Sequence, residues 1–598
     1  MRKVKETSLS VNGNLWKMRD VNQEIDKYLS ENQQFPKFIQ QILAQKFSKI
    51  EEIEAFLNSN LKFNLKDPYL LLDMEKAIEI FYQNIKDKKN IYIFADYDVD
   101  GTCSAAIIKR YAKAIDCEIN FYIPDRIKEG YGPNCQALKQ LKEQGAELII
   151  MVDCGIVAFE AVKTAKEIGL EVIILDHHIA TQELPIADAI VNPSRLDEDS
   201  EQTYLCAAGV CYLFIIALNR KLKKEKYFEQ KKLKEFDLFS LLGITAVATI
   251  CDVVPLKNLN RAFVKQGIKL LKQNPPIFLQ AIAQIADFEI EDLSCYHLGY
   301  IIGPRINAAG RVADASLGAQ LLLEDDLEQA IIMAKKLELR NKERKALEDQ
   351  VLSQAKEKVE KENLAKNNML IVAGENWHPG VIGIVASRLK ERYKLATSVI
   401  SIDGETAKSS VRSLPIINIA DKIKLAKENN LLVAGGGHAM AAGFTIETKK
   451  LAEFNKFMQE NTKSEMENNV NVINYDCKLP LSAISVSLIE ELKILEPYGQ
   501  ANSEPKFLIE NCKLCDLKIL KNKHHKARLV EYNQGIYGKS LDIIFWNSVD
   551  TKLDLFFANY KGQIISLIAK LKINKWNNYI KPQIEFIDLQ LPTALGFS

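Results

Sequence analysis

Short apolar runs alternate with helix-like stretches between residues 90 and 176. The runs NIYIF, ELIIMV and EVIIL are separated by TCSAAIIKRYAKAI and AFEAVKTAKEIG, whose apolar residues recur at helical spacing. Apolar strands that alternate with helices are typical of a parallel sheet with helices on both faces. The pattern therefore predicts an α/β domain whose functional site lies at the carboxyl ends of its strands.

The pattern changes several times along the rest of the chain, which predicts a multidomain α/β protein. In the charged segment 326–366, apolar residues at helical spacing share one face, so we expect one long connecting helix; they are Leu347, Val351, Leu352, Ala355 and Val359. Runs such as MLIVAGE and TSVISID predict a second α/β domain, and later short alternating strands predict a small β-barrel. The predicted boundaries are an N-terminal helical region at 1–68, the parallel-sheet domain at 69–325, the connecting helix at 326–366, the second α/β domain at 367–462 and the barrel at 463–598.

Composition narrows the class of protein. A chain of 598 residues, with 47% hydrophobic and 26% charged residues, fits several globular domains. No stretch approaches the ~20 apolar residues of a membrane span, and the N-terminus lacks the apolar segment of a signal peptide. The 11 scattered cysteines suit a reducing compartment, so we expect a cytoplasmic protein. The net charge of +1 means that any nucleic acid would bind in a local groove.

Acidic and imidazole groups follow each apolar run of the first α/β domain. Because the carboxyl ends of parallel strands meet at one edge of a sheet, we expect these groups to lie together. Carboxylates with imidazoles suit Mn²⁺ or a similar ion, and this many ligands could hold two ions that activate a water and clamp a phosphoryl group. The candidates are Asp96, Asp98 and Asp100 after the first run, Asp153 after the second, Asp176, His177 and His178 after the third, and Asp252 after the apolar run AVATIC.

Other metals and plainer roles have to be weighed. A calcium loop starting at Asp96 would need glutamate at its twelfth position, where the chain has Ile107. A single aspartate such as Asp153 is commonly a helix cap or a turn residue. Cys512 and Cys515 have the spacing of a zinc site, but no second pair follows them. The convergence of several strand ends favours a metal site in the first domain over these alternatives.

The residues after these apolar runs resemble those of the DHH phosphoesterase superfamily, which is named for a triplet such as Asp176, His177 and His178. Motifs along nearly the whole chain make the resemblance to its RecJ-type exonucleases closer still. The resemblance implies that Asp96, Asp98, Asp100, Asp153, His177 and Asp252 form the metal site, and that His178 contacts a phosphate. It also implies a DHH catalytic domain, a DHH-associated domain and an oligonucleotide-binding (OB)-like barrel. The motifs are ADYDVDG, VDCGI, LDHH, TICDVVP, GPRINAAGR, WHPGVIGIVASR, SSVRS, GGGHAMAAG and EPYGQANSEP.

The same resemblance implies a track for a nucleic-acid backbone. Fork-shaped arginine donors match phosphate oxygens, and glycine-rich segments allow close approach of a backbone. The implied substrate-binding residues are Arg126, His178, Arg305, Asn307, Arg311, Ser410, Arg412 and His438. Trp377 and His378 could stack against bases or shape the groove, although Trp377 could equally be a core residue. A basic cluster on a barrel hairpin could bind single strands or be a solvated loop: Lys521, Lys523, His524, His525, Lys526 and Arg528.

By resemblance we expect a 5′-to-3′ exonuclease that hydrolyses single-stranded DNA to mononucleotides in DNA repair, recombination and mismatch repair. The implied cofactors are two Mn²⁺ or Mg²⁺ ions, and the implied partners are single-strand binding protein and a RecQ-type helicase, with no membrane. One alternative is a DHH phosphodiesterase of short oligonucleotides or cyclic dinucleotides, although such enzymes lack the EPYGQAN segment and the barrel. Another is a non-catalytic scaffold, although every ligand position is intact in this chain.

Overall fold

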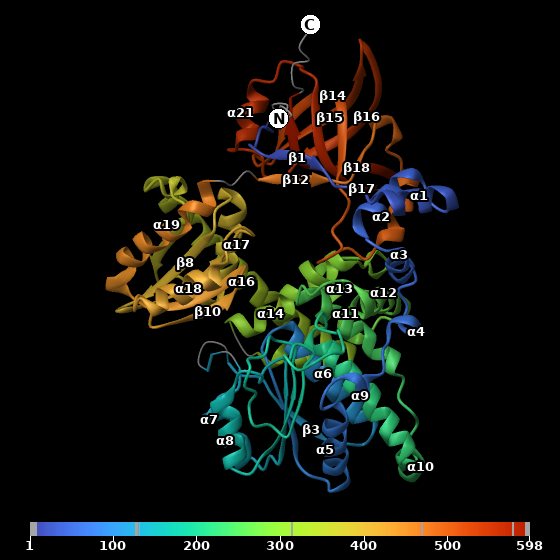
Figure 1. The fold of residues 1–598 in the computed structure, drawn as a ribbon, viewed down its shortest axis with the longest axis vertical. Coiled ribbons are helices and arrows are strands. Elements are labelled where there is room, and N and C mark those ends of the chain that lie inside the picture. The colour runs from blue at the N-terminus through green and yellow to red at the C-terminus, as the bar shows by residue number, and fades with distance from the viewer. Residues whose placement is uncertain are drawn as a thin grey trace. The chain divides into compact units, whose positions relative to one another are not determined.

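The computed structural model describes residues 9–125, 129–130, 132–312, 315–467, 471–576 and 579–591, without the side chains of 311, 312, 467 and 576. Its contacts divide the described residues into two compact units. One unit joins the described parts of 1–64 and 470–598 with the short segment 256–261. The other unit comprises the remainder, which includes both α/β sheets (Figure 1).

The first sheet is five-stranded and wholly parallel, which confirms the predicted parallel-sheet domain. Its strand order is β3-β2-β4-β5-β6. Since β3 and β4 lie on opposite sides of β2, the winding of the sheet reverses there, and such reversal points are where open α/β sheets bind ligands. The strands are β2 (Ile91–Ala95), β3 (Ile119–Tyr122), β4 (Leu148–Val152), β5 (Glu171–Leu175) and β6 (Ala189–Val191).

Helices cover both faces of this sheet. The apolar residues of α7 (Cys135–Glu143) and α8 (Phe159–Glu167) bury themselves against β4 and β5. Figure 1 shows the other helices on the opposite side of the strands. They are α5 (Met74–Lys86), α6 (Val99–Ala114) and α9 (Ala207–Lys224).

A helical layer follows the sheet in sequence. One continuous helical run begins as a π-helix, η4 (His297–Ile302), and goes on as α14 (Gly303–Val312). The other helices of this layer are α10 (Tyr227–Lys231), α11 (Leu242–Cys251), α12 (Asn258–Gln273), α13 (Ile277–Ala286) and α15 (Ser316–Leu323).

The long helix expected from the sequence is α16 (Leu327–Lys361). Asp326 caps its N-terminus by accepting a hydrogen bond from the backbone N–H of Gln329. The predicted apolar face packs against α17 (Pro379–Tyr393), with Val351, Ala355 and Val359 buried. The second half of α16 therefore forms part of the core of the second α/β domain.

The second sheet has five strands in the order β10-β11-β9-β8-β7, and only β7 and β8 run parallel. The strands are β7 (Leu370–Glu375), β8 (Thr397–Asp403), β9 (Thr406–Arg412), β10 (Ala434–His438) and β11 (Ala441–Glu447). Besides α17, the helices α18 (Ile419–Glu428) and α19 (Leu451–Glu467) belong to this domain.

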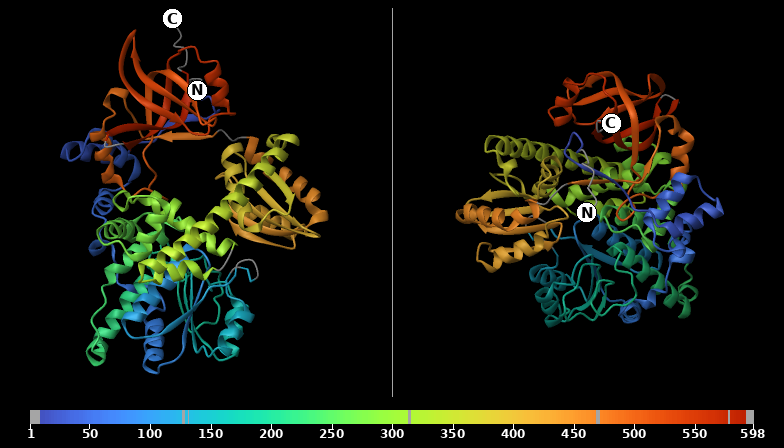
Figure 2. Two further views of the ribbon diagram at one scale, coloured as in Figure 1. Left: turned by 180° about the vertical axis from the view of Figure 1, so that it is seen from behind. Right: turned by 45° about the horizontal axis from the view of Figure 1, so that its top comes forward.

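The other unit contains the predicted barrel, visible from two further directions in Figure 2. Its five long strands close because β14 pairs with both β15 and β17, which leaves no open edge between them. They are β14 (Phe507–Leu520), β15 (His524–Asn533), β16 (Ile536–Phe545), β17 (Ile565–Trp576) and β18 (Tyr579–Gln590), with β13 (Cys477–Lys478), α20 (Val486–Glu491) and α21 (Lys552–Ala558) around them.

The N-terminal helices belong to the barrel unit. Strand β1 (Leu15–Met18) pairs in parallel with β12 (Val472–Tyr475), and both N-terminal and barrel residues share one core cluster. The helices are α1 (Gln23–Asn32), α2 (Lys37–Lys46), α3 (Ile50–Leu57) and α4 (Leu61–Asn64).

Buried Arg261 holds the segment 256–261 in the barrel unit. Its guanidinium lies 3.6 Å from the centre of the Phe56 ring and donates hydrogen bonds to the backbone carbonyls of Phe56, Leu495, Glu496 and Pro497. Because three of these carbonyls, those of Leu495, Glu496 and Pro497, lie at the start of the EPYGQAN motif or directly before it, that motif has a structural role in this unit.

Candidate functional site

The candidate metal centre lies where three neighbouring strands end. Asp96 follows β2, Asp153 follows β4 and Asp176 follows β5, and these strands are adjacent in the sheet. All three side chains are almost fully buried, with exposed fractions of 3%, 2% and 0%. The parallel topology therefore brings the strand-end carboxylates to one edge, as the sequence predicted.

His177 lies at the middle of this acidic cluster. Its Nε2 is 3.3 Å from Oδ1 of Asp153, 3.6 Å from Oδ2 of Asp252 and 3.8 Å from Oδ2 of Asp100. These distances are longer than direct hydrogen bonds, and His177 belongs to two candidate ligand groups, one with Asp153 and His178 and the other with Asp100 and Asp252.

The N-terminus of α6 supplies two further carboxylates. Asp98 is the N-cap of this helix, and its Oδ1 accepts hydrogen bonds from the backbone N–H groups of Asp100 and Gly101. Asp100 accepts from the N–H groups of Ala207 and Ala208 at 2.7 and 2.9 Å, at the N-terminus of α9. Two helix N-termini thus help to hold negative charge in a buried place.

Asp252 reaches the same centre from a helix instead of a strand. The apolar run before it forms α11, and Asp252 is the residue at which that helix ends. A helix C-terminus is an unfavourable place for a carboxylate, because the helix dipole is negative there. A cation beside Asp252 would offset that cost.

Three carboxyl groups of the cluster have raised pKa values, so they need a cation nearby to be charged at neutral pH. Burial, followed by neighbouring carboxylates, raises the pKa of Asp153 well above its ordinary value. For Asp252, burial together with Asp100 and Asp98 raises the pKa to about 9. In Asp100, burial raises the pKa although His177 acts in the opposite direction. A divalent ion among these groups would restore their charged forms.

Asp176 and His178 form a tight pair beside the cluster. The Nδ1 atom of His178 lies 2.8 Å from Oδ1 of Asp176, which also accepts hydrogen bonds from the backbone N–H groups of His177 and His178. Burial acts to lower the pKa of His178, but the hydrogen bond and charge of Asp176 outweigh it and raise the pKa to about 9. His178 is therefore a cation at neutral pH, held in place by its neighbour.

The donor set fits a divalent cation. Nε2 of His177 and Oδ2 of Asp252 are buried and have no hydrogen-bond partner among the described residues. Three overlapping groups each place their ligand atoms within 4.8 Å of one another: Asp153 with His177 and His178, Asp100 with His177 and Asp252, and Asp96 with Asp98 and Asp153. Buried oxygen and nitrogen ligands in this mixture suit Mn²⁺ or Mg²⁺.

A cavity of about 590 Å³ connects the first metal motif with the second α/β domain. Tyr97, between Asp96 and Asp98, lines it together with Lys408, Ser410 and Arg412 of β9 and the first turns of α17. Gly383 of α17 gives these donors room, because a Cβ atom there would lie 3.0 Å from Oγ of Ser410 and 3.1 Å from Nη2 of Arg412. Basic side chains and a helix N-terminus make this cavity suited to phosphate.

Three family models match successive parts of the chain. They are the DHH family N-terminal domain at 90–244, the DHHA1 domain at 366–464 and the RecJ OB domain at 475–588. The single-stranded-DNA-specific exonuclease RecJ of Bacillus subtilis is 32% identical over 580 residues, which is 96% of this chain and 70% of that protein. This chain belongs to the RecJ family of single-stranded-DNA-specific exonucleases.

Solved RecJ structures share the fold. The crystal structure of Thermus thermophilus RecJ in complex with Mn²⁺ superposes with a TM-score of 0.79 and 25% identity, and covers 97% of this chain and 80% of that one. The structure of the same protein with Mg²⁺ gives a TM-score of 0.72 at 23% identity, over 97% and 79% of the two chains. The Thermus thermophilus protein has thus been solved with each of the two ions that the donor set described above would suit.

Several substrate residues implied by the RecJ resemblance lie away from the cavity or outside the described residues. Arg126 and the side chain of Arg311 are outside the described residues. Arg305 forms an ion pair with Glu338 of α16, at 2.8 Å. Asn307 is half-buried on α14, and His438 is exposed at the end of β10.

Four residues suggested as binding or metal residues have structural positions instead. Trp377 is 5% exposed and donates a hydrogen bond from Nε1 to Gln354, so it is a core residue. His525 is buried and forms hydrogen bonds with Ser548. It is therefore not on the surface with the basic cluster of the barrel hairpin. Cys512 and Cys515 are free thiols on β14, and no candidate metal group among the described residues includes them.

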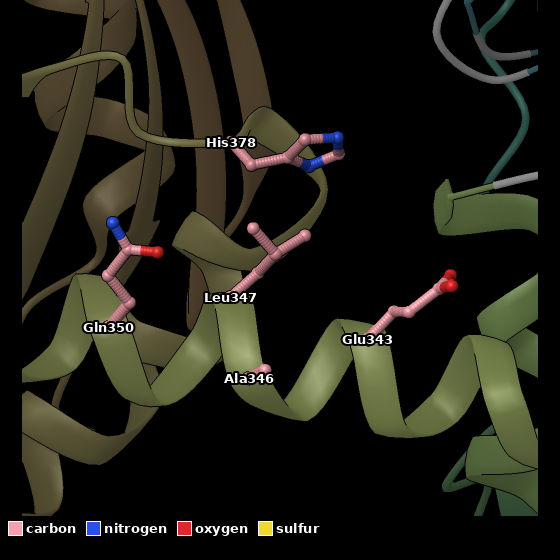
Figure 3. Close-up of a pocket in the computed structure, with 5 residues that line it drawn as sticks. All are labelled: Glu343, Ala346, Leu347, Gln350 and His378. Carbon is pink, nitrogen blue, oxygen red and sulfur yellow. The ribbon is translucent and has the colours of Figure 1, made fainter.

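A second cavity, of about 500 Å³, lies between α16 and the start of α17. Figure 3 shows Leu347 and Gln350 rising from α16 toward the loop that carries His378. His378 caps α17, since its Nδ1 accepts a hydrogen bond from the backbone N–H of Gly380. Glu343 and Ala346 complete the lining, and none of the implied metal ligands or phosphate-binding residues contributes to it.

Sequence reasoning missed Tyr97 and Lys408 as cavity residues. Tyr97 stands between two of the predicted ligands, and Lys408 lies two residues before Ser410 on the same strand face. The alternation of side chains along β9 could have identified Lys408 once Ser410 and Arg412 were chosen. No described helix of this RecJ family member is long and apolar enough to span a membrane.

Proposed function

We propose that this RecJ family member removes mononucleotides from the 5′ end of single-stranded DNA and acts in DNA repair, recombination and mismatch repair. The observation that carries the proposal is the convergence of Asp100, Asp153, His177 and Asp252 at one sheet edge, next to a basic cavity. An acidic cluster that binds cations beside a phosphate-binding cavity is suited to phosphodiester hydrolysis.

The metal centre is proposed to hold two Mn²⁺ or Mg²⁺ ions. The ligands would be Asp96, Asp98, Asp100, Asp153, His177 and Asp252. When bound, such ions lower the pKa of a water and neutralise charge on the phosphoryl group. Asp153 and His177 each occur in two of the three overlapping ligand groups, but only the carboxylate offers two oxygens, so Asp153 is the residue that could contact both ions.

His178 would hold the scissile phosphate. Its Nδ1 faces Asp176, so Nε2 is the nitrogen positioned to donate to a phosphate oxygen. The positive charge that Asp176 stabilises makes that hydrogen bond stronger than a neutral one. Because Asp176 acts through His178, it is a positioning residue.

The cavity beside Tyr97 would receive the terminal phosphate of the strand. Ser410 and Arg412 lie together there, with Nη1 of Arg412 3.0 Å from Oγ of Ser410, and the N-terminus of α17 adds backbone N–H donors. Arg126, Arg305, Asn307, Arg311 and His438 are proposed to contact the backbone farther along. A phosphate cavity of this kind at the end of a track supports exonucleolytic cleavage from a 5′ phosphate.

We further propose that the protein acts in the cytoplasm with single-strand binding protein and a RecQ-type helicase. No disulfide joins the cysteines that the structure describes, which suits a reducing compartment. A nuclease limited to single strands needs another protein to expose them, which supports a helicase partner.

The test uses oligonucleotides of one sequence, labelled internally, in single-stranded and duplex form with Mn²⁺. We expect the protein to degrade the single strand and not the duplex. Phosphorothioates at the 5′ end should block this degradation, whereas those at the 3′ end should not affect it. Asp153→Asn should abolish cleavage and retain most DNA affinity, because it removes a ligand and leaves the cavity intact.

Exposed Asp199, changed to Asn, is the matched control and should cleave normally. Blocking by the 3′ phosphorothioates would overturn the polarity, and cleavage of dinucleotides with long strands left intact would favour a small-substrate phosphodiesterase. Efficient cleavage by Asp153→Asn would contradict the proposed metal centre.

A further inference from the structure

Two exposed tyrosines form a stacked pair on the helical run that carries the GPRINAAGR motif. The rings of Tyr296 and Tyr300 have their centres 5.4 Å apart and their planes 25° from parallel. Their exposed fractions are 61% and 73%, which is unusual for large aromatic residues. Neither hydroxyl has a hydrogen-bond partner among the described residues, so the pair is not explained by the packing of the fold.

The pair is supported from below by other rings. Tyr296 meets His297 edge-on at 5.7 Å, and His297 lies against Phe288 at 4.9 Å. The Nδ1 of His297 is 3.0 Å from Oγ of Ser294, which fixes the imidazole. A platform that is already ordered loses little conformational entropy when a flat ligand stacks on it.

The same helical run passes directly beside the catalytic cluster. A Cβ atom at Gly303 would lie 2.5 Å from Sγ of Cys251, the residue before Asp252. At Gly310 a Cβ atom would lie 2.9 Å from the backbone carbonyl of Tyr97, in the first metal motif. The helix that carries the two tyrosines thus leads from an exposed surface to the metal centre.

Asn307 extends this surface toward the centre. It stands seven residues after Tyr300 on the same helical run, between Gly303 and Gly310, the two glycines that lie against the metal motifs. The distance from Tyr296 to Asn307 along the axis is at most roughly 16 Å, the value at 1.5 Å per residue, because the π-helical part rises less per residue. A single strand lying along this run would meet the tyrosines first and the catalytic cluster afterwards.

We propose that Tyr296 and Tyr300 form a stacking platform for the nucleobases of the single-stranded substrate as it approaches the metal centre. This inference rests on the proposed function. Flat aromatic rings bind any base by its π-face without reading sequence, which suits a nuclease that must degrade all sequences. Bases paired and stacked in a duplex cannot present that face, so the platform also favours single strands over duplex DNA.

The experiment compares a strand that has bases with one that has none. Binding to a fluorescent thymidine oligonucleotide and to an abasic tetrahydrofuran oligonucleotide of equal length is measured by anisotropy, with EDTA to prevent cleavage. The full-length double variant Tyr296→Ala/Tyr300→Ala should bind the thymidine strand about tenfold or more weakly. Its affinity for the abasic strand should equal that of the wild type, because backbone contacts are unchanged.

Conservative variants separate stacking from folding. Tyr296→Phe/Tyr300→Phe should restore the affinity, whereas Tyr296→Gln/Tyr300→Gln should not, even though glutamine is a good surface residue of helices. Tyr28→Ala, at an exposed tyrosine on α1, is the matched control and should bind both strands normally.

Equal losses on the two strands would assign the pair a structural role and overturn the proposal. Unchanged affinity for the thymidine strand would overturn it as well, and would leave the exposed rings as a surface for a protein. Cleavage by the wild type is assayed separately with Mn²⁺. A wild type that stacks bases but does not cleave would refute the proposed function alone.

Discussion

Replacing Asp176 with asparagine tests how the cluster keeps His178 charged. The substitution keeps the shape of the side chain and removes the negative charge that lies 2.8 Å from Nδ1 of His178. Burial then remains as the main influence on the imidazole, and burial lowers the pKa of a histidine. Because the charges of Asp252 and Asp100 still act to raise it, we expect the pKa of His178 to fall from about 9 toward its ordinary value of 6.5.

The size of the effect follows from these values. At pH 7.5 a pKa of about 9 leaves His178 about 97% protonated, whereas a pKa of 6.5 leaves about 9%. The shift of His178 corresponds to about 3.4 kcal/mol and that of Asp176, from 3.8 to about 2, to about 2.4 kcal/mol. Since the His178 side chain is 36% exposed and solvent screens its charge, we take the smaller value and expect about 2 kcal/mol.

The sign of the stability change depends on pH. Because the folded pKa of His178 is raised, its contribution is complete below about pH 6.5 and is lost as the pH rises through about 9. The folded pKa of Asp176 is lowered, so its contribution is present above about pH 3.8 and is lost as the pH falls through about 2. The variant should therefore differ most from the wild type between about pH 4 and 6.5.

The assay is carbon-detected NMR of protein labelled at histidine Cε1 and freed of metal with a chelator. Because the chain has seven histidines, the resonance of His178 is assigned as the one that is missing from the spectrum of His178→Gln. Urea unfolding at pH 5.5 and pH 9.5 measures the change in stability. Asp188→Asn, at an aspartate that pairs with Lys166, is the control and should leave the His178 titration unchanged. A His178 resonance that titrates near pH 6.5 in the wild type, or near 9 in Asp176→Asn, would refute the reasoning.

Three other changes test the rest of the site. Mn²⁺ binding should release protons at pH 7, because burial and neighbouring carboxylates raise the pKa of Asp252 to about 9; calorimetric heats that do not depend on the buffer would contradict this. Gly101→Ala should lose Mn²⁺ binding, since its Cβ would lie 2.4 Å from the Asp96 carbonyl oxygen, and calorimetric binding equal to the wild type would argue against it. Gly383→Ala should raise the KM for single-stranded DNA several-fold and leave kcat almost unchanged, because its Cβ would displace Arg412. A lower kcat at the same KM would place the defect in the chemistry instead.

The strand-end ligands could be predicted because their positions depend on local pattern and one topological rule. Apolar runs identify β2, β4 and β5, and the carboxyl ends of parallel strands share an edge. Asp96, Asp153 and Asp176 follow from that rule without further information. The long helix α16 was predictable for a similar reason, since its apolar residues recur over many turns.

Features that depend on contacts between distant segments could not be predicted. Asp252 reaches the metal cluster because α11 packs against α6, a contact that the apolar run before Asp252 does not show. Arg305 stands in a motif expected to bind substrate, yet its guanidinium pairs with Glu338, which comes 33 residues later. Strand β1 pairs with β12 across most of the chain, a partner that no local pattern identifies.

The contrast between Asp176 and Asp153 shows how one sheet edge produces different chemistry from the same residue type. Both follow neighbouring strands and both are buried. Asp176 accepts hydrogen bonds from three backbone N–H groups and faces the His178 imidazole, which together outweigh its burial and lower its pKa to about 2. For Asp153, burial and four neighbouring carboxylates raise the pKa, so this group needs a cation to stay charged. The backbone N–H groups and the imidazole around Asp176, and not the residue type, therefore separate the carboxylate that orients a histidine from the one suited to bind metal.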